Sequence, residues 1–159
     1  MEKIEQQNME ILDRLHLAKL IPEREFTIKL LGDHLSAQGV GLSLDHDGDL
    51  YVSDALIGFP FWVSSNSLHK VVILLACHDY SSEQAALEAL EAMQRLRLGP
   101  ITPQFFLDGK SLYAQYLLSY RELLVISHVY EAACRFAEYA SNMPFVVKEA
   151  SAELRRRAH

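Results

Sequence analysis

The chain has 159 residues, of which 50% are hydrophobic and 23% charged, and its net charge is -6. This composition excludes a disordered or fibrous chain, and the length is that of one domain, residues 1–159, whose core needs neither disulfides nor a metal. The negative charge argues against nucleic acid or an anionic membrane as the main partner.

Two helices are expected first. Residues 2–20 repeat apolar side chains at the spacing of one helical face, which predicts an extra N-terminal helix within 1–22. Pro22 interrupts this pattern and suits the first turn of a second helix, which should end at Gly39 or Gly41. No basic segment leads into an apolar run at the N-terminus and no apolar run is long enough to span a membrane, so we expect a cytoplasmic protein.

Strands are expected from Leu42 onward. The pair Asp47-Gly48 between apolar runs predicts a hairpin over 42–54. In the next strand, 55–65, alternation places Ile57, Phe59, Phe61 and Val63 on one face, and Pro60 indicates an edge or a bulge. The run 69–78 is apolar on both faces, which is typical of a central strand that is covered on each side.

The second half of the chain repeats this alternation of helix and strand. Ser81 with Gln84 forms a capping-box pattern that predicts a helix up to Gly99. Two strands should follow about an Asp108-Gly109 turn, the first shortened by Pro103. The last long helix should begin near Arg121, and a break at Asn142 and Pro144 separates it from a short tail helix over 144–159.

The expected order is therefore helix, helix, three strands, helix, two strands, helix. Strands and helices segregated in this way predict an α+β fold, an antiparallel sheet with helices packed mainly on one face. Cys77 and Cys134 lie in apolar surroundings without metal-ligand spacing, which favours reduced core thiols over a disulfide.

Several residue patterns resemble metal-binding or catalytic motifs, but each matches its motif only in part. The carboxylates of Asp45, Asp47 and Asp49 resemble a calcium loop, but strands flank them and the glutamate of an EF-hand is missing, so we favour a hairpin turn. Cys77 and His78 are neighbours on a strand and should point to opposite faces, so one cannot deprotonate the other.

A zinc site from His69, Cys77 and His78 fits no closed four-ligand pattern. Tyr113, Tyr116 and Tyr120 could stack on nucleic-acid bases, but no Lys or Arg is interleaved with them. We therefore expect no catalytic residues, no metal and no cofactor.

The remaining signal is apolar surface. If Phe59 and Phe61 face the helices, the opposite face of the sheet presents Gly58, Pro60 and Trp62, and the neighbouring strand adds Val72 and Leu74 or their alternates. A tryptophan beyond the helices is either an interface anchor or part of a second core layer. Self-association, a partner-protein site and plain core remain open.

Five segments carry a resemblance to a known fold family: KLLGDHLSAQGVGLSLDHDGDLYVSD, HKVVILLACH, SSEQAALEALEAMQRLRLG, FFLDGKSLYAQYLLSY and RELLVISHVYEAACRFAEYA. Over residues 24–141 the order resembles the type III secretion chaperone-like fold, which includes YbjN-like proteins described as sensory-transduction regulators. The resemblance implies a small acidic bacterial protein without enzymatic activity, typically a homodimer, that holds a client segment on apolar patches and strand edges. The N-terminal helix and the tail depart from this pattern and could cover the client's surface, which favours the regulator-like branch or a different oligomer.

The expected function is a non-enzymatic, homodimeric protein-binding module that holds a partner segment on the sheet face around Trp62. The alternative is a small-molecule sensor or enzyme whose pocket lies between sheet and helices and uses Cys77, His78 or His128. A structural oligomer-former without any other partner is a third possibility.

Overall fold

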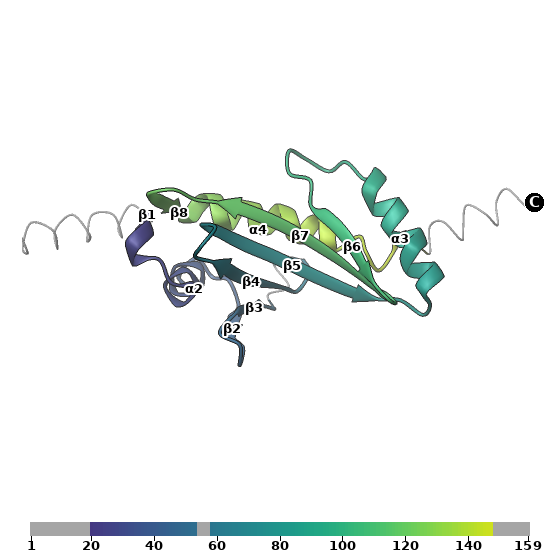
Figure 1. Cartoon of the computed structure of the whole chain (residues 1–159), viewed down its shortest axis with the longest axis horizontal. Coiled ribbons are helices and arrows are strands. Elements are labelled where there is room, and N and C mark those ends of the chain that lie inside the picture. The colour runs from purple at the N-terminus through teal and green to yellow at the C-terminus, as the bar shows by residue number, and fades with distance from the viewer. Residues whose placement is uncertain (1–19, 54–57, 148–159) are drawn as a thin grey trace, which may run out of the picture.

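The structure is a computed structural model that describes residues 20–53 and 58–147. It is an α+β fold in which three α-helices accompany an antiparallel sheet, with the elements arranged along the chain as shown in Figure 1. In chain order they are β1 (Leu20–Pro22), the 3-10 turn η1 (Glu23–Glu25), α2 (Ile28–Ala37), β2 (Leu42–Leu44), β3 (Leu50–Val52), β4 (Phe61–Asn66), β5 (Val71–Asp79), α3 (Glu83–Arg95), β6 (Gln104–Asp108), β7 (Ser111–Ser119), β8 (Leu123–Val125) and α4 (Ile126–Ala140).

The main sheet has six strands in the order β2-β3-β4-β5-β7-β6, and all neighbours are antiparallel. Its two longest strands, β5 and β7, pair over nine residues, from Val71 opposite Ser119 to Asp79 opposite Ser111. The central position expected for the apolar run 69–78 is confirmed.

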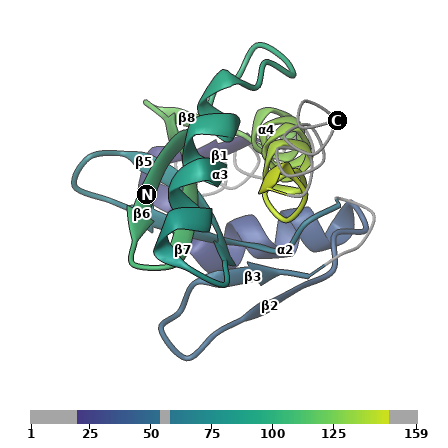
Figure 2. The same ribbon diagram turned by 90° about the vertical axis from the view of Figure 1, so that its right-hand side faces the viewer.

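The helices cover one face of this sheet. In Figure 1, α4 runs behind β5 and β7, and Figure 2 shows the helices grouped beside the sheet when it is seen from its end. Several strand side chains that point to the helices are fully buried, among them Phe61, Val63 and Leu74. Phe61 meets Phe136 of α4 edge to face, with ring centroids 5.5 Å apart. The predicted arrangement of helices on one face is confirmed in the described residues.

A second, two-stranded sheet joins the two ends of the described chain. β1 pairs antiparallel with β8, with Leu20 opposite Val125 and Pro22 opposite Leu123. The sequence prediction was wrong here: Pro22 ends a strand instead of starting a helix, and the helix expected from Arg121 begins at Ile126 because the preceding three residues form β8.

Two of the three α-helices in the described residues, α2 and α3, begin at a side-chain cap, whereas α4 follows β8 without one. Thr27 Oγ1 accepts a hydrogen bond of 3.1 Å from the Leu30 amide and begins α2. Ser82, not the expected Ser81, caps α3 through a bond of 3.1 Å from the Ala85 amide, and this helix ends at Arg95, before Gly99. One hydroxyl at the first orphaned amides is enough to fix each start.

Both predicted Asp-Gly turns are confirmed, with positive φ values of 84° at Gly48 and 58° at Gly109. Four strands instead of three lie between α2 and α3, because the arms of the first hairpin are separate strands. The strand expected to contain Pro60 begins at Phe61, since proline has no amide to donate to β3 or β5. The expected helix over 2–19, residues 54–57 and the tail over 148–159 lie outside the described residues.

Candidate functional site

The side of the main sheet that faces away from the helices is here called the open face. Strand side chains alternate, so its members are the positions between the buried ones. Across β3, β4, β5, β7 and β6 its apolar members are Tyr51, Trp62, Val71, Ile73, Leu75, Cys77, Phe106, Tyr113 and Leu117, and its polar members are Ser64, Asn66, Asp79, Gln104, Asp108, Ser111, Gln115 and Ser119.

Trp62 is the centre of one side of this face. Tyr51 pairs with it from β3, with ring centroids 5.1 Å apart, and Leu75 lies opposite it on β5. Trp62 is 37% exposed, and Leu117, two strands away, is 45% exposed. Large apolar groups at the surface of a regular sheet are typical of a contact with another molecule.

The partners expected for Trp62 need a correction. Val72 and Leu74 are fully buried and belong to the core under the helices, because Leu74 pairs with buried Val63 while Trp62 pairs with Leu75. Their alternates Ile73 and Leu75 are the residues that share a face with Trp62. Gly58 and Pro60 are exposed but precede β4, so they border the open face instead of forming part of the strand.

The opposite side of the open face combines aromatic rings with carboxylates. Phe106 and Tyr113 stack with ring centroids 5.0 Å apart and planes 5° apart, and Phe106 is 43% exposed. In the next cross-strand row, Asp79 and Asp108 flank Ser111, whose Oγ donates a 2.5 Å hydrogen bond to Asp79 Oδ1. Sequence reasoning missed this group, because Asp108 was interpreted only as a turn residue.

The candidate nucleophile is not activated. Cys77 lies on the open face, while His78 lies on the other face. The His78 ring packs edge to face against Tyr80, with ring centroids 4.8 Å apart. Burial raises the pKa of the Cys77 thiol, so the protonated form is favoured at neutral pH. The expected separation of Cys77 from His78 is confirmed.

The metal candidates do not converge. His69 is in the turn after β4, where its amide donates to Asn66 Oδ1 at 3.1 Å, and it does not join Cys77 and His78. Asp45 Oδ1 accepts from the amides of Asp47 and Asp49 at 2.9 and 3.0 Å, so this carboxylate organises the hairpin. Within the described ranges, no group of three or more His, Cys, Asp or Glu side chains could hold a metal ion.

The three candidate stacking tyrosines are dispersed. Tyr113 is on the open face, Tyr116 is on the helix side of β7, and Tyr120 packs against Phe26 with centroids 5.0 Å apart. They therefore do not form a platform for nucleic-acid bases.

A hollow of about 250 Å³ lies between β7, α4 and the segment after α3. Its apolar wall includes Ile101, Tyr116 and Leu118, and α4 contributes His128 and Arg135 at the rim. Arg135 is held by Glu131 in an ion pair of 2.9 Å. Of the three residues named for a small-molecule pocket, His128 alone lines this hollow.

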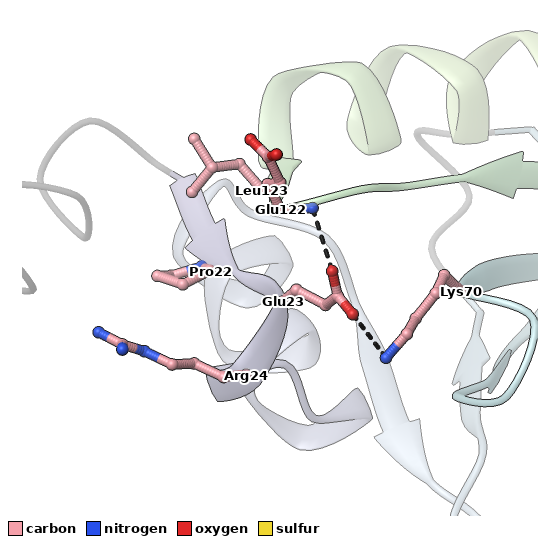
Figure 3. Close-up of a pocket in the computed structure, with 6 residues that line it drawn as sticks. All are labelled: Pro22, Glu23, Arg24, Lys70, Glu122 and Leu123. Atoms are coloured by element: carbon pink, nitrogen blue, oxygen red, sulfur yellow. Dashed lines mark hydrogen bonds and ion pairs between the residues drawn. The ribbon is translucent and has the colours of Figure 1, made fainter.

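A larger, open hollow of about 520 Å³ lies where the two sheets approach each other (Figure 3). Glu23 reaches across it: its Oε1 is 2.6 Å from Lys70 Nζ and its Oε2 accepts from the Glu122 amide at 3.2 Å. The hydrogen bond from Lys70 lowers the pKa of Glu23. These contacts join the small sheet to the turn before β5.

No helix in the described part of the chain is long and apolar enough to cross a membrane.

Comparison with known proteins gives a fold and no family. No family model matches the chain, and no curated protein matches it. Among solved structures, YbjN of E. coli, a candidate transcription regulator, superposes with a TM-score of 0.57 at 15% identity, covering 81% of this chain and 94% of its own. At this identity the likeness concerns the fold alone. The described chain has a YbjN-like fold.

Proposed function

We propose that this chain is a non-enzymatic protein-binding module of the chaperone-like or regulatory kind, which holds a segment of a partner protein on the open face and forms a homodimer. The observation that carries the proposal is the exposed apolar side of a regular sheet, centred on Trp62 and Leu117. An exposed tryptophan next to aliphatic side chains is typical of an interface anchor.

The chemistry of the described residues supports a binding role over an enzymatic one. Cys77 is separated from His78 by the sheet and its pKa is raised, and the carboxylates lie on turns, strand ends and exposed helix faces. The YbjN-like fold, together with the regulatory role suggested for YbjN, favours the regulator over the secretion chaperone.

The test is recovery of the partner from native cells with tagged full-length chain under mild salt. We expect one protein to be retained at near-fixed stoichiometry by the wild type, and its retention to fall about thirtyfold or more with Trp62→Asp. The matched control is Leu68→Asp, which adds the same charge at an apolar side chain that is 83% exposed in the turn after β4, outside the strands of the sheet.

Equal recovery by Trp62→Asp and Leu68→Asp, with both variants folded by circular dichroism, would contradict the proposed face. Light scattering during size exclusion measures the homodimer separately. A monomeric mass at micromolar concentration would remove the dimer from the proposal and leave the binding face in place.

The hollow beside His128 supports a second candidate, a small-molecule sensor. This candidate predicts a bound metabolite in gently purified protein, detected as added mass by native mass spectrometry and lost in Leu118→Arg. Bare polypeptide at every purification stage would count against it.

A further inference from the structure

The end of the open face that contains Asp79 and Asp108 combines aromatic and acidic side chains. The stacked rings of Phe106 and Tyr113 form one cross-strand row, and Asp79, Ser111 and Asp108 form the next. Ser111 Oγ and the Cys77 thiol both donate to the same oxygen, Asp79 Oδ1, at 2.5 and 3.9 Å. The two carboxylates are exposed, so they stand beside the aromatic pair at the surface.

The charge of this face has one sign. None of the open-face positions of the sheet from β3 to β6 is Lys or Arg, and the acidic side chains of this face are Asp79 and Asp108, both at this end. The nearest cation along the chain is Lys110, in the turn between β6 and β7. A partner that covers the apolar rows would therefore meet two carboxylates with no cation supplied by the face itself.

We propose that the partner segment held on the open face is apolar with a Lys or Arg side chain at one end, and that this cation is received by Phe106, Tyr113, Asp79 and Asp108. The inference rests on the proposed function and specifies its partner. A cation over an aromatic face is attracted by the ring's quadrupole, and a guanidinium or ammonium that also meets a carboxylate makes a charge-assisted hydrogen bond.

The same charges argue against a second copy as the occupant of this face. A copy docked face to face would bring two further aspartates and no Lys or Arg from its open face, because that face carries the same residues. Like charges placed together at an interface oppose association. The homodimer of the proposed function then uses another surface, and the open face of each copy remains available for a partner.

The test uses a random 12-residue peptide library displayed on phage and the immobilised full-length chain. Binders are first sorted by their dependence on Trp62, by counter-selection on Trp62→Asp. Among Trp62-dependent binders we expect Lys and Arg to be enriched at least about threefold over the input library. With the double variant Asp79→Asn and Asp108→Asn we expect this enrichment to disappear.

The matched control is the double variant Asp33→Asn and Asp47→Asn, which changes the net charge equally at exposed aspartates on α2 and in the first hairpin. Enrichment should persist in this control. Trp62-dependent binders without basic enrichment, or enrichment lost equally in both double variants, would overturn the inference and leave the proposed function standing. A selection that yields no Trp62-dependent binder would overturn both this inference and the proposed function.

Discussion

Glu23 and Lys70 form an ion pair of 2.6 Å that fastens the segment after β1 to the turn between β4 and β5. The Lys70 hydrogen bond lowers the pKa of Glu23 below 4.5, and the Glu23 hydrogen bond raises the pKa of Lys70 above 10.5. A lowered carboxyl pKa adds stability above 4.5 that is lost as pH falls through the folded-state value. A raised lysine pKa adds stability below 10.5 that is lost at higher pH.

The variant Glu23→Gln should therefore have a lower melting temperature than the wild type at pH 7. This gap in melting temperature should close as the pH falls below 4.5. The amide of Gln can still accept from the Glu122 amide, so the variant isolates the charge. Both side chains are partly exposed, so 0.5 M NaCl should narrow the gap as well. Glu91→Gln on the exposed side of α3 is the control, and a gap that stays constant from pH 7 to pH 3 would contradict the prediction.

Leu74 and Leu117 lie on adjacent strands and opposite faces, so they test the assignment of the open face. Leu74→Ala should lower the free energy of unfolding by about 2–5 kcal/mol, because Leu74 is fully buried. Leu117→Ala should change it by less than about 0.5 kcal/mol, because Leu117 is 45% exposed. Urea titrations followed by circular dichroism measure both, and similar losses in the two variants would show that the open face is covered in the isolated chain.

Tyr80 ties the end of β5 to the turn after α4. Its hydroxyl donates to the Met143 carbonyl at 2.5 Å, and burial raises its pKa to about 12. Tyr80→Phe should lower the free energy of unfolding by about 0.5–1.5 kcal/mol at pH 7. Because a raised pKa adds stability that is lost as pH rises, the difference should shrink between pH 10 and pH 12. A difference that is unchanged over this range would refute the burial of the phenol.

Gly32 lets α2 lie directly against Leu50 of β3. A Cβ at this position would lie 2.8 Å from Leu50 Cδ2, and Leu50 is 99% buried, since only 1% of it is exposed. Gly32→Ala gains about 0.5–1 kcal/mol of helix propensity but overpacks the core, which costs about 1–3 kcal/mol, so we expect a net loss of about 1 kcal/mol. In the Leu50→Ala background the same substitution should become stabilising, and additive effects in this double-mutant cycle would contradict the close contact.

Local patterns in the sequence predicted most of the elements, since Asp-Gly turns, capping hydroxyls and apolar periodicity act within a few residues. The face on which Val72 and Leu74 lie could not be predicted in this way. A strand that is apolar at every position has the same pattern in two registers, and a shift of one residue exchanges its faces. Trp62 opposite Leu75, instead of opposite Leu74, is decided by pairing with the neighbouring strand.

Pairing between segments far apart in the chain also explains why the sequence did not predict β1, β8 and the group around Asp79 and Asp108. β1 and β8 are three residues each. The sequence of β1 continues the apolar pattern of residues 2–19 and that of β8 continues into α4, so neither carries a strand signal of its own. Asp79 and Asp108 come together because β7 lies between β5 and β6, which cannot be inferred from either residue's local sequence. The exposure of Trp62 could be predicted because the residues next to it alternate clearly between apolar and small or polar.

The pairing of β1 with β8 has a consequence for how the chain acquires its structure during synthesis. Its two strands are separated by about a hundred residues, as in the contact between Glu23 and Glu122, so β1 must wait until nearly all of the described chain has left the ribosome. Because β8 continues directly into α4, the same event fixes the first turn of that helix. Closure of such a long loop is slow relative to local hairpins, so the main sheet should form first and the small sheet should complete the fold.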